Sequence, residues 1–226
     1  MSAAEDEGRA PIGAPEMTQG HGRSAPDTVV RAVIRGLYEG RYVPGQRLGE
    51  PDLISEYGVS RSTVREAIRR LEADGVVETI PYRGAQIRRL TAREARDALL
   101  LFQALIALAA RLAAERIGEA DGRERVAEAW KGLEAQAADL DGFDGARARD
   151  RFHRALAAAS GNRDVMRVLP GMQAHLIRFS WSAPAETKLD SYKAIVRAVL
   201  SGEAEKAEAA ARAHVDEILA LVVPEI

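Results

Sequence analysis

The stretch from Val59 to Gly75, VSRSTVREAIRRLEADG, constrains the fold of this chain more than any other. Ser60 can cap a helix by accepting a hydrogen bond from a free amide of the first turn, and Gly75 can end that helix in the left-handed conformation. Between them, apolar residues recur at the spacing of one helical face, at Val64, Ala67, Ile68 and Leu71. The stretch therefore predicts a helix with one buried side.

The same helix carries a row of arginines beside its apolar face. Arg61, Arg65 and Arg69 stand four residues apart, so their guanidinium groups line one edge of the helix. Two of the three lie near the electropositive N-terminus. Arginines on a helix most often only keep it soluble, and the flanking sequence decides here in favour of a helix that enters a DNA groove.

Short elements flank this basic helix on both sides. Residues 50–57 predict a short helix, and Gly58 supplies a tight turn before the basic helix. Downstream, the alternating run 76–80, a turn at 81–84 and a short strand at 85–89 predict a two-stranded hairpin. Helix, glycine turn, basic helix and hairpin together make a winged helix-turn-helix.

These segments resemble the winged-helix DNA-binding domain of GntR-type bacterial transcription regulators. The resemblance rests on PGQRL at 44–48, on Glu50, on GVSRSTVREAIRRLEADGVV at 58–77 and on RGA at 83–85. It covers roughly residues 27–90. It implies that this half of the chain binds double-stranded DNA.

The resemblance also implies which side chains meet DNA. Arg61 and Arg65 would contact bases in the major groove. Ser60 and Thr63 would contact the backbone, while Gly84 would let the wing enter the minor groove. The other candidates for DNA contact are Arg47, Arg69 and Arg83.

Two features limit the expected contacts with phosphate. Pro51 stands where many relatives carry a basic residue, and proline suits the first turn of a helix but cannot bond a phosphate. The region 27–90 holds 11 arginines and 9 acidic residues, a net charge of +2, in a chain whose net charge is -2. Electrostatic steering toward DNA is therefore expected to be weak.

Composition is that of a globular protein with room for two domains. Among the 226 residues, 46% are hydrophobic and 29% charged. The absence of cysteine excludes disulfides, thiolate nucleophiles and cysteine zinc sites. No run approaches the roughly 18 apolar residues that cross a bilayer, and the N-terminus lacks the pattern of a signal peptide. We expect a cytoplasmic, nucleoid-associated protein with no membrane contact.

The chain is expected to be mainly α-helical, with a tail and two domains. Residues 1–25, rich in Gly, Pro, Ser, Glu and Ala, predict a disordered tail. Asp27 is expected to cap the first of three helices in a winged domain over 26–90. The segment 91–226 predicts an all-α effector-binding and dimerisation bundle of about six helices. Their expected ranges are 91–117, 122–140, 142–160, 163–182, 186–200 and 203–223, the first opened by a capping box of Thr91 and Glu94.

This second half resembles the FCD effector domain of the FadR-type branch of the same regulators. RDRFHRALAAASGN at 149–162 is similar to its D-x-x-x-H and S-G-N signature, and residues 191–214 are similar to its last two helices. The resemblance implies an all-α bundle that senses a metabolite. In that family an aspartate and three histidines commonly hold a divalent metal, which binds a carboxylate effector.

This chain keeps half of that ligand set. His153 and His214 stand at two of the histidine positions, whereas Arg149 replaces the aspartate and Tyr192 the middle histidine. Two imidazoles rarely fill a divalent site, and a nearby guanidinium repels a cation. No metal or other cofactor is predicted. A divalent metal held by His153, His175 and His214 stays open as an alternative.

Arg149 instead suggests direct binding of an anionic effector, because it places a fixed positive charge where relatives use a metal. Phe102 and Ile106 align with pocket positions that often carry Arg and Glu, so we expect an effector with an apolar body and one acidic group. Arg149→Ala should then abolish the effector response and leave DNA affinity unchanged. The alternative is that Arg149 pairs with a carboxylate and effector binding is lost. The candidate effector-binding residues are Arg149, His153, His175, Arg178, Tyr192 and His214.

The sequence thus indicates a homodimeric repressor on a pseudo-palindromic operator, with the bundle modulating DNA affinity. An enzyme is disfavoured because paired carboxylates, a nucleophile with its base and a phosphate-binding glycine loop are all missing from the sequence. A winged helix that binds protein is the other alternative. The row of arginines argues against it, and a salt-sensitive DNA affinity would exclude it.

Overall fold

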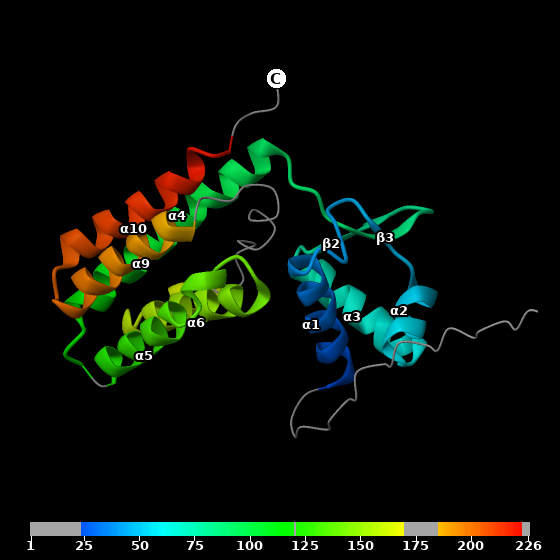
Figure 1. Ribbon diagram of the computed structural model, residues 1–226, viewed down its shortest axis with the longest axis horizontal. Coiled ribbons are helices and arrows are strands. Elements are labelled where there is room, and N and C mark those ends of the chain that lie inside the picture. Colours follow the sequence, from blue (N-terminus) through cyan, green and yellow to red (C-terminus); the bar gives the residue numbers. More distant parts are fainter. Residues whose placement is uncertain (1–23, 120, 170–184, 223–226) are drawn as a thin grey trace, which may run out of the picture.

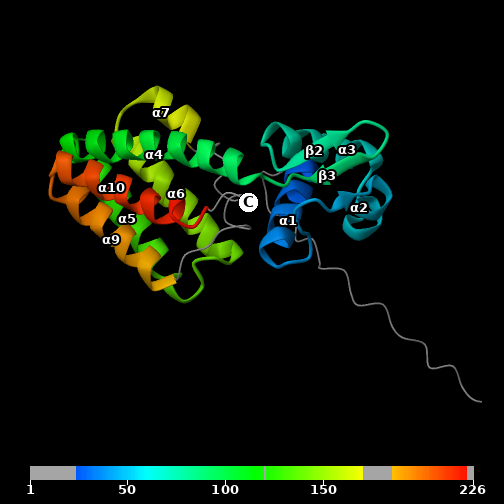
Figure 2. The same cartoon turned by 90° about the horizontal axis from the view of Figure 1, so that it is seen from above.

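The computed structural model describes residues 24–119, 121–169 and 185–222. The described chain is mainly helical, as predicted, with one small sheet. A winged helix-turn-helix and a helical bundle form two lobes side by side, and residues 88–91 connect them (Figure 1, Figure 2).

Helix α1 (Ala25–Tyr38) begins three residues before the position that the sequence predicts. The expected cap, Asp27, is wrong, because Ser24 is the N-cap and Asp27 is the N3 residue of its capping box. The Ser24 hydroxyl donates to the Asp27 carboxylate at 2.6 Å, and this bond holds the pKa of Asp27 below its ordinary value. Arg70, in the basic helix predicted from the sequence, also binds Asp27, so this carboxylate connects two helices. The buried side of α1 consists of Val29, Val33, Gly36 and Leu37.

Helices α2 (Glu50–Tyr57) and α3 (Arg61–Ala73) form the helix-turn-helix. Ser60 caps α3 by accepting a hydrogen bond from the Thr63 amide at 3.2 Å, and Gly75 follows the helix with a φ of 66°. The predicted boundaries of α3 and its buried face are thus confirmed. That face consists of Val64, Ala67, Ile68 and Leu71.

The wing is a three-stranded sheet rather than the predicted two-stranded hairpin. β2 (Val77–Ile80) and β3 (Gly84–Ile87) form the hairpin, and β1 (Arg47–Leu48) pairs with the other side of β3. All neighbours are antiparallel. A strand of two residues is too short for apolar alternation to reveal it in the sequence.

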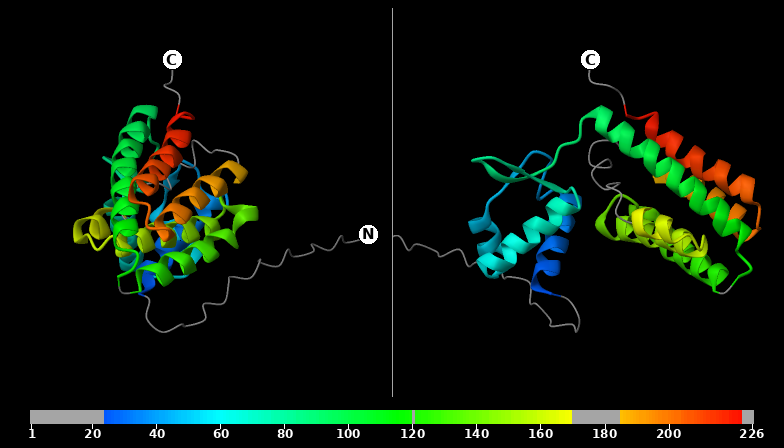
Figure 3. Two further views of the ribbon diagram at one scale, coloured as in Figure 1. Left: turned by 90° about the vertical axis from the view of Figure 1, so that its left-hand side faces the viewer. Right: turned by 180° about the vertical axis from the view of Figure 1, so that it is seen from behind.

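The C-terminal lobe packs α4, α9 and α10 together, with α5 and α6 against them (Figure 1, Figure 3). The helix expected over 122–140 ends early, because the chain bends into the short 3-10 helix η1 so that Leu133 and Leu140 are both buried. The helix expected over 163–182 is described only to Val168, and its remainder lies outside the described residues. The elements are α4 (Ala92–Glu115), α5 (Gly122–Glu134), η1 (Ala137–Asp139), α6 (Phe143–Ala159), α7 (Arg163–Val168), α9 (Ala185–Leu200) and α10 (Ala204–Leu219).

Helix α4 is the central helix of the bundle. By length and composition it could cross a membrane, with a window of mean hydropathy 1.7. It packs instead against α6, α9 and α10, and its alanine-rich side is buried among them. The bundle core therefore accounts for the apolar residues on that side of the helix.

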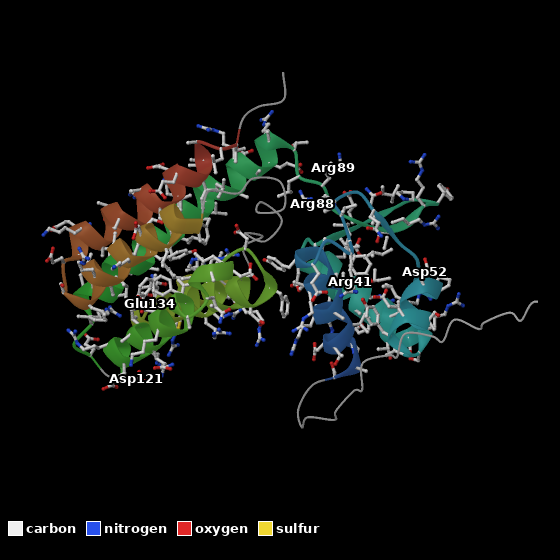
Figure 4. The ribbon with its side chains drawn as sticks, in the orientation of Figure 1. Arg41, Asp52, Arg88, Arg89, Asp121 and Glu134 are labelled. Atoms are coloured by element: carbon white, nitrogen blue, oxygen red, sulfur yellow. The ribbon has the colours of Figure 1, made fainter. Side chains whose placement is uncertain are left out.

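Ion pairs and hydrogen bonds order the connection between the lobes. Glu94 accepts from the Thr91 amide at 2.9 Å and from Arg88 at 2.7 Å, which confirms the predicted capping box. Arg89 donates to the Pro44 carbonyl at 3.1 Å. Figure 4 shows Arg88 and Arg89 on the stretch between the wing and α4. The connection is therefore held to both lobes.

Glu94→Gln tests the charge in this connection. The Thr91 amide and Arg88 lower the pKa of Glu94 to about 2, so its carboxylate stabilises the fold above pH 4.5 and loses that effect as the pH falls toward 2. Because the side chain is 44% exposed, we expect a loss of only about 0.5 kcal/mol in the free energy of unfolding at pH 7. Urea denaturation at pH 7, 5, 4 and 3 should show the two proteins converging. A constant difference would exclude the charge as the cause.

Candidate DNA interface and effector site

Glu50 lies between the two arginines that are predicted to read bases. Its two carboxylate oxygens stand 3.4 Å from Arg61 Nε and 3.2 Å from Arg65 Nε. The arginine side chains nevertheless stay 73% and 63% exposed. One carboxylate on α2 can therefore orient two guanidinium groups of α3 while leaving them accessible. Sequence comparison marked Glu50 as part of the motif without indicating this contact.

The N-terminus of α3 also carries Ser60 and Thr63, the residues predicted to contact the DNA backbone. The Ser60 hydroxyl lies 2.8 Å from the hydroxyls of both Ser62 and Thr63. These groups share the end of the helix where the free amides give a positive potential, which favours phosphate. Arg69 is exposed two turns after Arg61, on the same side of the helix. The geometry fits a helix that meets DNA with its first two turns.

The wing brings the other predicted DNA contacts together. Gly84 has a φ of 80°, a conformation that favours glycine, and Arg83 is exposed immediately before it. Arg47 extends from β1 alongside, so that a side chain on Gly84 would stand 3.9 Å from its guanidinium. Pro51, by contrast, is exposed near the start of α2 and offers no donor to a phosphate.

In the bundle, three of the predicted effector residues meet. The Tyr192 hydroxyl lies 3.2 Å from His153 Nε2, and the Tyr192 and His214 rings are 4.3 Å apart between centroids. Ser191 Oγ, which the sequence did not single out, lies 2.7 Å from His214 Nδ1. All three predicted residues are buried. Helices α6, α9 and α10 thus form one polar cluster inside an apolar core.

Aromatic and aliphatic side chains surround this cluster. The Phe102 ring meets the His153 ring edge-on with centroids 5.1 Å apart, and Phe152 meets Tyr192 at 5.4 Å. Ile106 is fully buried on the same helix as Phe102. Phe102 thus places an apolar ring directly beside His153.

Arg149 lies one helical turn before His153, and its guanidinium is directed toward the turn after η1. It is 3% exposed, donates to the Leu140 carbonyl and approaches the Asp141 carboxylate at 3.5 Å. The neighbouring Asp150 points elsewhere and binds Arg154 at 2.8 Å. Arg149 therefore stabilises the start of α6 as well as being a candidate ligand group. This second task was invisible in the sequence.

Metal binding has little support in the described chain. Residues 24–119, 121–169 and 185–222 contain no group of three His, Cys, Asp or Glu side chains placed to hold an ion. His153 and His214 share the cluster with Tyr192, whose phenol occupies the place between them. His175 and Arg178, the remaining candidates, lie outside the described residues.

Phe143 joins the two lobes, which the sequence did not indicate. As the first residue of α6, it packs edge-on against Tyr38 of α1, with ring centroids 6.1 Å apart, and the Arg35 guanidinium lies 4.6 Å above its ring. A hollow of about 490 Å³ adjoins this contact, between the end of α1 and residues 136–144. The aromatic contact is thus a localised one, next to space into which either lobe could move.

Comparisons with known proteins extend over both lobes. The model of the gntR family of bacterial regulatory proteins matches residues 26–87, and that of the FCD domain matches residues 85–217. The HTH-type transcriptional regulator LutR of Bacillus subtilis is 30% identical over 208 residues, covering 80% of this chain and 94% of LutR. A probable D-xylose utilization operon transcriptional repressor of Paenarthrobacter nicotinovorans is 28% identical over 187 residues, covering 81% and 82%.

Solved structures share the arrangement of both lobes. A GntR-type regulator from Rhodococcus sp. RHA1 superposes with a TM-score of 0.70 at 23% identity, covering 87% of this chain and 96% of that one. McbR/YncC of E. coli gives the same TM-score at 19% identity, covering 88% and 97%. At such identities the likeness concerns the fold.

Proposed function

Because the chain belongs to the GntR family of bacterial regulatory proteins and carries an FCD domain, we propose that it is a transcription repressor whose DNA affinity is set by a small anionic metabolite. Like the other members of the family and the relatives reported above, it is a transcription regulator and not an enzyme. It would act in the cytoplasm on double-stranded DNA. The observation that carries the proposal is the pairing of an exposed arginine row on α3 with a buried polar cluster in a separate bundle.

The proposed assembly is a homodimer on a pseudo-palindromic operator. Helix α4 leaves Leu100, Leu101 and Leu108 exposed, although the opposite side of the same helix is fully buried in the bundle. Large exposed side chains on a central helix are suited to packing against a second copy. A dimer formed through the bundles would present two recognition helices to successive turns of the major groove.

The proposed effector is an anion with an apolar body. Arg149 would supply the positive charge, while His153, Tyr192 and His214 would donate or accept hydrogen bonds. Phe102 and its neighbours would contact the apolar part. To reach the effector, Arg149 would exchange its bond to the Leu140 carbonyl for one to the ligand, so ligand binding and the turn after η1 would be coupled.

This turn offers a route from the bundle to the winged lobe. Arg149 fastens Leu140 and Asp141, and Phe143 contacts α1 only two residues later. Gly145 makes the turn tight, because an added Cβ would stand 2.3 Å from the Asp139 carbonyl oxygen. Release of the guanidinium would therefore loosen the segment that carries Phe143. The orientation of the winged lobe, and with it the spacing of two recognition helices, would change.

Phe143→Ala is expected to uncouple the lobes. Ligand affinity should stay within about twofold, whereas the change in DNA affinity caused by ligand should fall at least about threefold. The chain lacks cysteine, so spin labels at cysteines replacing the exposed Asp52 and Glu134 can report the distance between lobes (Figure 4). The distance distribution should broaden in Phe143→Ala and stay narrow in Phe143→Leu, which retains apolar bulk. Equal distributions would refute the route.

One experiment tests the function as a whole. The purified protein is used to select duplexes from a random DNA pool, and affinity for the selected and the random duplex is measured between 50 and about 200 mM salt. A repressor should prefer the selected duplex by at least about a thousandfold and lose affinity with salt. Titration with anionic metabolites should then weaken binding. Absence of any preferred duplex would refute DNA-specific regulation.

The alternative of a metal-dependent sensor is tested by elemental analysis of untagged protein purified without chelator. About one divalent ion per chain would require a rebuilt histidine site, with His175 or water completing the shell. If no ion is present and none binds on addition, the bundle acts through Arg149, or it has lost effector binding and no titrated anion will change DNA affinity.

A further inference from the structure

Tyr82, at the tip of the wing, is unlike every other aromatic residue described in this chain. Its side chain is fully exposed, with a relative exposure of 107%. It also has a φ of 65°, and it is the only residue other than glycine with a positive φ in the described part of the chain. It stands in the turn between β2 and β3, directly before Arg83 and Gly84.

The exposed ring and the positive φ of Tyr82 do not stabilise the free protein. A left-handed conformation costs a non-glycine residue about 1 kcal/mol or more, and a fully exposed ring recovers none of it by burial. Strain of this kind at an exposed tip is characteristic of residues that act on a ligand. The neighbouring side chains are positively charged, since Arg83 follows Tyr82 and Arg47 lies beside Gly84.

We propose that Tyr82 determines specificity by entering the DNA minor groove with Arg83, where its ring packs on the sugars and its hydroxyl donates to an A·T pair. This rests on the proposed DNA binding. In the minor groove A·T pairs offer the acceptors adenine N3 and thymine O2, whereas G·C pairs add a protruding amino group. A phenol has an apolar ring and a hydroxyl that donates a hydrogen bond, so it suits A·T pairs. The amino group of a G·C pair would obstruct it. Tyr82 would favour A·T pairs at the flanks of the operator.

Salt dependence separates this uncharged contact from a contact made by a positively charged side chain. On the duplex selected by the wild-type protein, Tyr82→Ala is expected to lose about tenfold in affinity, with an unchanged slope of log K against log salt. Arg83→Ala is the matched comparison. Its slope should be smaller by about 1, because the variant lacks the guanidinium that displaces a counterion when the wild-type protein binds. Tyr82→Phe should lose only the hydrogen bond and fall between wild type and Tyr82→Ala.

Base analogues identify the groove. Replacing the flanking A·T pairs by I·C pairs preserves the minor-groove acceptors and changes the major groove, whereas G·C pairs add the amino group. Wild type should bind the A·T and I·C duplexes equally and the G·C duplex about tenfold more weakly. Tyr82→Ala should bind all three alike. Retained discrimination in Tyr82→Ala, or a loss for I·C equal to that for G·C, would overturn the proposal.

Folding is controlled with Tyr82→Gly, which relieves the strained φ. It should unfold at the same or a higher temperature than wild type and still lose DNA affinity like Tyr82→Ala. Wild-type affinity in either variant would show that the exposed ring has no part in binding. If the wild-type protein prefers no duplex, the proposed DNA-binding function itself is refuted. That failure is distinguishable from failure of the Tyr82 proposal, because it is seen with the wild-type protein alone.

Discussion

Arg65→Ala is expected to weaken binding to the selected duplex by about 1 to 3 kcal/mol, with a much smaller loss on random DNA. Arg65 is 63% exposed on the second turn of α3, and Glu50 approaches its Nε at 3.2 Å. An arginine held in this way presents its fork in a defined direction, which allows two hydrogen bonds to one guanine edge. Truncation removes both bonds and leaves the guanine acceptors without a partner.

Arg65→Lys is the matched control for this loss. It keeps the positive charge but replaces the planar fork by a single ammonium, so it should lose most of the preference while retaining affinity for random DNA. Fluorescence anisotropy with selected and random duplexes at one salt concentration measures both. Equal losses on the two duplexes for Arg65→Ala would show that Arg65 contacts phosphate and carries no sequence information.

The elements that could be predicted from sequence are those with local causes. Helix α3 has its cap, its buried stripe and its terminating glycine within one short stretch, so pattern alone located it. The predicted cap of α1 is wrong because Ser24 and Asp27 are both good capping residues. Only the structure shows that Ser24 takes the cap and Asp27 completes the box. β1 exists through pairing with a strand far along the chain, a long-range cause without a local signal.

The candidate site divides in the same way. The histidine and tyrosine positions followed from the resemblance, and the structure places His153, Tyr192 and His214 together. The contact of Arg149 with the Leu140 carbonyl could not be foreseen, because it depends on where the chain turns after η1. The contact between Phe143 and α1 depends on how the two lobes meet. Both are products of tertiary packing, which no local spacing encodes.

Arg149→Met is expected to change three properties at once, since methionine fills similar space but donates no hydrogen bond. The free energy of unfolding should fall by about 1 to 3 kcal/mol, because the buried Leu140 carbonyl loses its charged donor. The response of DNA affinity to anionic ligands should disappear. DNA affinity without ligand should fall toward that of ligand-saturated wild type, because the turn before Phe143 is no longer fastened. This last point revises the expectation from sequence that ligand-free affinity would be unchanged.

Arg149→Lys and Asp141→Asn separate these effects. Lysine keeps the charge and should retain part of the ligand response, whereas Asp141→Asn removes the exposed carboxylate and should leave the response intact, because the Leu140 carbonyl bond remains. Urea denaturation, ligand calorimetry and anisotropy measure stability, ligand affinity and DNA affinity independently. A normal ligand response in Arg149→Met would show that another group binds the anion. A lost response with normal ligand-free DNA affinity would retain Arg149 as the ligand group and exclude the turn as its route to the winged lobe.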